Sequence, residues 1–66
     1  MKILNAQNVS NKTSLSVSHI RRLSKEGKFP KPIQISSIRP GWLEADVDDW
    51  IERKHLEAKD VILNNH

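Results

Sequence analysis

Hydrophobic and polar positions along the first fifteen residues predict a short strand followed by a short helix. The apolar pair at residues 3–4 suits an edge strand or a lead-in to the fold. Asn5 is a good N-cap, so we expect a helix from there to about Lys12, with Val9 as its main buried residue. Residues 13–15 would form a tight turn.

A second helix is predicted from Ser16, as N-cap, through about Glu26, with Gly27 ending it in a left-handed conformation. At 100° per residue, Ile20 and Leu23 lie on one side and pack inward. Two short helices joined by three residues have the dimensions of a helix-turn-helix. The side opposite the core forms a continuous polar and basic stripe without an acidic residue: Ser18, Arg21, Arg22 and Lys25.

A small hairpin is predicted next. Residues 29–32, Phe-Pro-Lys-Pro, cannot be helical, because each proline removes a donor and restricts its predecessor. Residues 33–35 alternate like a strand, residues 36–37 are a turn, and a return strand begins at Ile38 and ends at Pro40-Gly41. This hairpin would be a wing. Its outward side chains would be Lys31, Gln34 and Arg39, and its core-covering ones Ile33, Ile35 and Trp42.

A third helix is expected from Glu44, with acidic residues in its first turn, where the helix dipole favours anions. Its inward stripe has helical spacing: Val47, Trp50, Ile51, Lys54 and Ala58. If the helix continues, Val61 and Ile62 extend that stripe beyond the small core. They are either a frayed end or a contact surface for another protein.

Length and composition narrow the class of protein. Sixty-six residues make one small domain, which we place at 1–60, with 61–66 as a C-terminal tail. The absence of cysteine excludes disulfides and thiolate metal sites. No apolar run approaches the roughly 20 residues of a membrane span, and no signal peptide begins the chain. We therefore expect a cytoplasmic protein with no membrane partner.

The formal net charge of +3 is unevenly distributed. Residues 1–16 carry two cations and no acid, a net +2. Residues 17–39 carry six cations and one acid, a net +5. Residues 40–60 carry three cations and seven acids, a net −4. A basic middle followed by an acidic helix favours one face for a polyanion, although an ordinary solvated surface is the alternative interpretation.

Candidate catalytic and metal sites can be set aside. The three histidines lack metal-ligand spacing. Asp48 and Asp49 are adjacent on a helix and diverge by about 100°, so they cannot form a paired carboxylate site. Gly27 and Gly41 are isolated, which excludes a glycine-rich phosphate loop. We predict no enzyme, no cofactor, no metal and no small-molecule substrate.

Several motifs together resemble the AlpA family of phage and prophage regulators, part of the excisionase-like and MerR-type winged helix-turn-helix group. The likeness covers about residues 3–54. Two departures are Ser14, where a turn glycine is usual, and Arg21, where an aromatic residue is frequent. The matching residues include Leu15-Ser16, Ser18, Ile20, Arg22-Leu23, residues 25–33 (Lys-Glu-Gly-Lys-Phe-Pro-Lys-Pro-Ile), Arg39, residues 41–44 (Gly-Trp-Leu-Glu), Val47, Trp50 and Ile51.

The resemblance implies a mainly α fold with a small β-hairpin, a winged helix-turn-helix that binds double-stranded DNA. It implies a regulator of integrase or excision genes of a mobile element, located at the nucleoid. Two alternatives stay open: an excisionase that bends attachment-site DNA with integrase, and a protein-interaction adaptor or antirepressor that uses the C-terminal helix. One small domain also suggests a homodimer or a cooperative assembly on DNA.

Roles for individual residues follow from placing the helix at residues 17–26 in a major groove and the wing at 33–42 on the flanking backbone or minor groove. Arginine can pair bidentately with guanine. We expect base reading by Ser18, Arg21 and Arg22, and backbone contacts by Ser16, His19, Lys25, Lys28 and Lys31. We expect wing contacts by Gln34 and Arg39, and a candidate protein contact by Val61 and Ile62.

Overall fold

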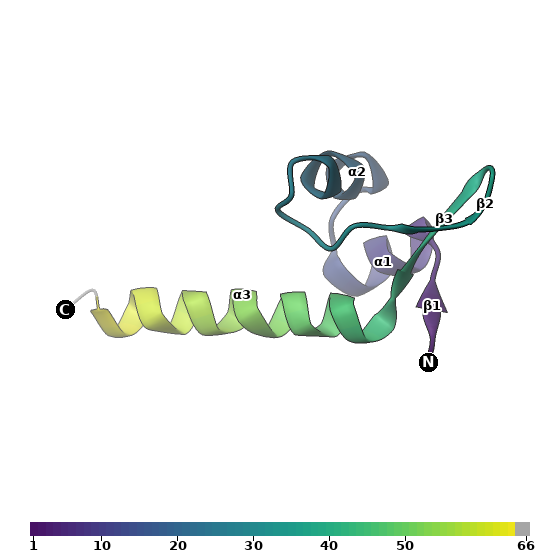
Figure 1. The fold of residues 1–66 in the computed structure, drawn as a ribbon. Helices are drawn as coiled ribbons and strands as arrows, with labels where there is room; N and C mark the ends of the chain where they lie inside the picture. The colour runs from purple at the N-terminus through teal and green to yellow at the C-terminus, as the bar shows by residue number, and fades with distance from the viewer. Residues whose placement is uncertain (65–66) are drawn as a thin grey trace.

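A computed structural model describes the backbone of residues 1–64 and the side chains of residues 1–59. Within these residues, three helices and three strands follow one another in the order β-α-α-β-β-α (Figure 1). This arrangement is compatible with a winged helix-turn-helix. The elements are β1 (Ile3–Leu4), α1 (Ala6–Thr13), α2 (Val17–Lys25), β2 (Ile33–Ser36), β3 (Arg39–Leu43) and α3 (Glu44–Asn64).

Local capping signals define α1 and α2, as the sequence predicts. The Asn5 side chain accepts a hydrogen bond from the Asn8 amide at 2.7 Å, and the Ser16 hydroxyl accepts one from the His19 amide at 3.1 Å. At the other ends the backbone turns left-handed, with φ 66° at Ser14 and φ 78° at Gly27. Both helices are thus short because residues next to them in the sequence begin and end each one.

The three strands form one antiparallel sheet in the order β1-β3-β2. The predicted return strand was placed wrongly: β3 begins at Arg39, after a turn at residues 37–38, and runs on to Leu43. Its extension has a physical cause, since Leu43 pairs with Ile3 of β1. The Glu44 amide then donates to the Lys2 carbonyl at 2.9 Å, so the first residues secure the junction between β3 and α3.

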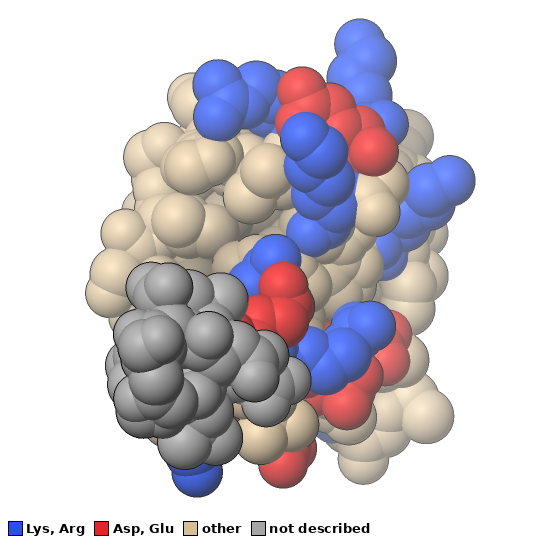
Figure 2. Space-filling view, turned by 90° about the vertical axis from the view of Figure 1, so that its left-hand side faces the viewer, with Lys and Arg blue, Asp and Glu red and all other residues tan. Residues whose placement is uncertain are grey.

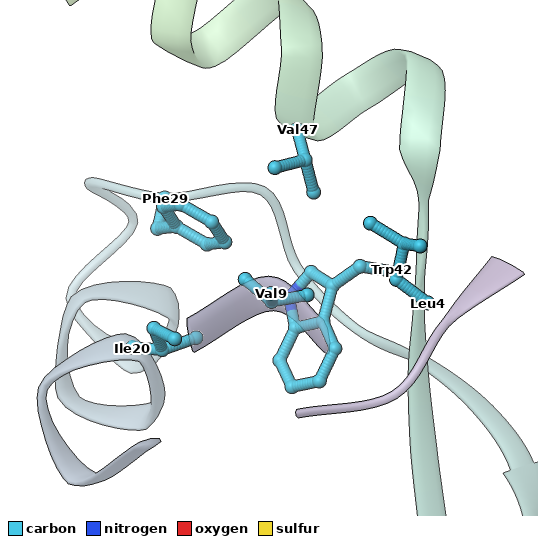
Figure 3. Packing of buried hydrophobic residues seen from close by; sticks show 6 residues of the cluster. All are labelled: Leu4, Val9, Ile20, Phe29, Trp42 and Val47. Carbon is cyan, nitrogen blue, oxygen red and sulfur yellow. The ribbon is translucent and has the colours of Figure 1, made fainter. Parts of the chain in front are cut away.

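The hydrophobic core takes one residue from nearly every part of the fold (Figure 3). Trp42 is the largest of them and is only 1% exposed. Burying side chains of this size contributes about 1.5–3 kcal/mol each, which is substantial for a domain of this length. The core residues are Leu4 of β1, Val9 of α1, Ile20 of α2, Phe29, Trp42 of β3 and Val47 of α3.

The β2–β3 hairpin contributes less to this core than its sequence predicts. Ile33 and Ile35 are 44% and 52% exposed, so the expectation that they cover the core was wrong, whereas Trp42 does so. The reason is that the hairpin projects away from the helices (Figure 1). The base of the hairpin meets β1 at Gly41. A Cβ atom there would lie 2.6 Å from the side chain of Ile3 in β1 and 2.8 Å from that of Ile35 in β2.

Helix α3 packs on the rest of the molecule through its first two turns. Trp50 contacts the Phe29 ring at a centroid distance of 4.8 Å and donates from its indole nitrogen to the Lys28 carbonyl at 2.9 Å. From residue 52 to 59 the side chains are exposed, and the helix extends from the body (Figure 1). The predicted contact residues Val61 and Ile62 lie outside the described side chains. No helix in the described part of the chain has the length and apolarity needed to cross a membrane.

Candidate nucleic-acid interface

Helix α2 presents one buried side and one exposed side. Ile20 is fully buried and Ser24 is 5% exposed, so these two, one helical turn apart, fix the inward direction. The hydroxyl of Ser24 donates to the Pro30 carbonyl at 3.1 Å, which satisfies a buried polar group. The structure places all four residues of the predicted polar stripe on the exposed side: Ser18, Arg21, Arg22 and Lys25.

The residues predicted to flank this stripe differ in their surroundings. Ser16 is exposed and its oxygen caps the helix, while His19 is half-buried. Lys28 lies 3.8 Å from the Glu26 carboxylate and Lys31 is exposed. Such an exposed ion pair contributes little to stability, so Lys28 can exchange Glu26 for another anion at small cost.

The hairpin residues predicted as wing contacts are both exposed. The Gln34 amide nitrogen already donates to the Ser36 carbonyl at 2.6 Å and helps shape the turn, leaving the amide oxygen as an acceptor. Arg39 is at the start of β3, directly after the turn. Arg39 lines a shallow hollow with Ile3 of β1 and Asn8 of α1, so its side chain lies on the β1 side of the hairpin.

Charge is divided between two sides of the molecule. Figure 2 shows Lys and Arg side chains over the top, where α2 lies, with acidic atoms among them, and further Asp and Glu side chains lower, mixed with basic residues around α3. In α1, Lys12 lies 2.7 Å from Asp48 and 3.2 Å from Glu44. Lys12 donates to the carboxylates of Asp48 and, with a smaller effect, Glu44, and these bonds raise the pKa of Lys12 above its usual value. The acids of α3 are thus partly neutralised away from α2.

A groove of about 380 Å³ separates α2 from the base of the hairpin. Its lining combines the cations Arg21, Lys25 and Lys31 with the apolar residues Pro32, Pro40 and Trp42. The Trp42 indole nitrogen donates to the Pro30 carbonyl at 2.9 Å, the same oxygen that Ser24 uses. Sequence reasoning missed Pro32, Pro40 and Trp42 as lining residues, because their meeting with α2 depends on tertiary packing. The burial of Ser24 could have been found, since it follows Ile20 by one turn.

Among the described residues, no three His, Asp or Glu side chains gather as metal ligands would. The polar groups on the exposed side of α2 are instead cations and a hydroxyl, with the carboxylate of Glu26 at the end of the helix. Cations and hydroxyls donate to phosphate oxygens and to the edges of bases. The geometry is suited to binding an extended anion over an exposed surface.

The model of the family described as prophage CP4-57 regulatory protein (AlpA) matches residues 2–55, which covers every strand, α1, α2 and the packed part of α3. Neither a curated protein nor a solved structure matches the chain.

Proposed function

Because the chain belongs to the AlpA family of prophage regulatory proteins, we propose that it is a sequence-specific regulator that binds double-stranded DNA of a phage, prophage or integrative element. In this proposal the fold acts as a winged helix-turn-helix. Helix α2 enters a major groove, and the hairpin reaches the flanking backbone or minor groove. The observation that carries the proposal is the exposed side of α2, where three cations and a hydroxyl stand without an acidic residue.

Position along α2 supports separate roles for these side chains. The N-terminal part of a recognition helix reaches deepest into the groove, which favours Ser18 and Arg22 for contacts with base edges. Arg22 can pair bidentately with guanine. Lys28 and Ser16 lie at the two ends of the helix and suit phosphates, as does Arg39 on the hairpin. Arg21, which the sequence also favours for base reading, lines the groove toward the hairpin.

Selection from a random duplex library tests the proposal, followed by titration of the winning sequence over a range of salt concentrations. If about five cations each neutralise one phosphate, the slope of log K against log salt is about −4.5. Affinity then falls about 500-fold between 50 and 200 mM salt. Failure to enrich any sequence over random DNA would exclude a sequence-specific regulator.

The same module could serve an excisionase, and DNA geometry distinguishes the two activities. Sites at promoters favour a regulator, whereas sites in attachment-site arms that are strongly bent favour an excisionase. A gel assay with the selected site at different positions in fragments of equal length measures the bend. A footprint over promoter or attachment-site arms gives the matching location.

A single short helix reads only a few base pairs, so we expect more than one copy to bind a natural site. Binding would then be cooperative or dimeric, and a selected sequence would contain a repeated half-site. Analytical ultracentrifugation of the protein with duplexes of one and two half-sites measures the number of copies bound.

A further inference from the structure

We propose that the groove between α2 and the hairpin holds one sugar-phosphate strand of the bound DNA. A phosphate lies among Arg21, Lys25 and Lys31, and the adjoining deoxyribose lies against Pro32 and Pro40. This inference rests on the proposed function and deepens it. It assigns Arg21 to the DNA backbone, in place of the base-reading role predicted from the sequence.

The arrangement of grooves in duplex DNA supports this assignment. A sugar-phosphate strand always separates a major groove from the neighbouring minor groove. If α2 occupies the major groove and the hairpin the adjacent minor groove, the strand between them crosses the surface between these two elements. That surface is the groove lined by Arg21, Lys25 and Lys31.

Charge and polarity fit this occupant. None of the residues lining the groove is acidic, and its three cations come from α2 (Arg21 and Lys25) and from the loop before β2 (Lys31). A second groove of similar volume, between residues 27–30 and α3, is different: Asp46, Asp49 and Glu57 line it together with basic residues. Unlike this second groove, the first combines three cations with apolar residues and no acidic residue, which suits a phosphate joined to a sugar.

The groove is also held open by fixed contacts. Ser24 on α2 and Trp42 on β3 both donate to the Pro30 carbonyl, at 3.1 and 2.9 Å. The two walls are therefore tied to one point of the connecting loop, and their separation does not depend on a ligand. A site formed in advance loses less free energy on binding than one that must be ordered.

The experiment measures binding of the full chain to a selected duplex and to a random duplex. The variants are Arg21→Gln, Lys25→Gln and Lys31→Gln, with Lys59→Gln on α3 as the control of equal charge change. We expect each groove variant to weaken both duplexes by the same factor. Each variant should also reduce the magnitude of the salt slope by about 0.9. Between 50 and 200 mM salt, the fall in affinity should then be about 3.5-fold smaller for the variant than for wild type. Lys59→Gln should change neither quantity.

Duplexes with a single neutral methylphosphonate then locate the contact. We expect one phosphate, or two adjacent ones, whose neutralisation weakens wild type several-fold but no longer weakens Lys31→Gln or Arg21→Gln. Additive effects of variant and methylphosphonate at every position would overturn the inference. Loss confined to the selected duplex for Arg21→Gln would overturn it too, because Arg21 would then read bases. Neither of these two results would contradict the proposed function. If wild type bound neither duplex, the proposed function and this inference would both be overturned.

Discussion

Trp42 and Ser24 donate hydrogen bonds to the same acceptor, the carbonyl oxygen of Pro30, although they belong to different elements of the fold. Trp42 lies on β3 and is 1% exposed, and Ser24 lies on α2 and is 5% exposed. Because both residues bond to this one oxygen, the position of the hairpin base relative to α2 is fixed. The spacing between the two elements is thus set by the Phe-Pro-Lys-Pro loop that joins them.

Ser24→Ala should lower the free energy of unfolding by about 1 kcal/mol, because it removes one buried hydrogen bond while Pro30 keeps its bond from Trp42. Urea unfolding followed by circular dichroism measures the change. Ser18→Ala, on the exposed side of the same helix, is the matched control and should leave stability within about 0.5 kcal/mol. Equal effects of the two substitutions would contradict a structural role for the Ser24 hydroxyl.

Arg22→Ala should weaken binding to the selected duplex by about 1–3 kcal/mol and relax the preference at one base position. Lys28→Ala should weaken selected and random duplexes alike, because a phosphate contact carries no sequence information. Parallel titrations of both variants on both duplexes measure the difference. If Arg22→Ala weakened the two duplexes by the same factor, Arg22 would be a backbone contact.

Lys12 makes the stability of the fold depend on pH in the alkaline range. Its pKa is raised in the folded protein by Asp48 first and Glu44 second. The stabilisation is therefore complete below the ordinary lysine pKa of about 10.4 and is lost as the pH rises through the raised value. We expect the difference in urea midpoint between wild type and Lys12→Gln to be constant from pH 7 to 9 and to shrink above about pH 10.4. A difference that grew with alkaline pH would contradict the ion pairs.

The two left-handed positions should respond in opposite directions to substitution. Ser14 has φ 66° and bears a side chain, so Ser14→Gly should raise stability by up to about 1 kcal/mol. Gly27 has φ 78° with open space around it, so Gly27→Ala should cost about 1 kcal/mol through the backbone alone. Thermal unfolding should register shifts of about 4–8 °C per kcal/mol for a domain of this size. A stabilising Gly27→Ala would refute this account.

The helices could be predicted from the sequence because their limits are local. Asn5 and Ser16 each bond an amide three residues ahead, and Gly27 needs no distant partner to end α2. The polar stripe follows from helical periodicity once Ile20 is taken as buried. These features depend on neighbours within about four residues, which a single sequence contains in full.

The hairpin and the groove could not be predicted in the same way. Strand β3 extends to Leu43 because it pairs with Ile3, forty residues earlier, and no local pattern marks that pairing. Ser36 and Ser37 are equally suited to a turn, which shifted the predicted turn by one residue. The approach of Pro40 to Arg21 likewise depends on how the sheet packs against α2.

Strand β1 and the far end of α3 both lie on the side of the molecule away from α2 (Figure 1). The protein can therefore be tethered to a sensor surface through a tag at residue 1 without covering α2. Tethering by residue 1 places the tag beside Lys2, whose carbonyl holds the start of α3. A flexible spacer at that end would keep this bond free of strain, and the immobilised chain would offer α2 and the hairpin to the solution.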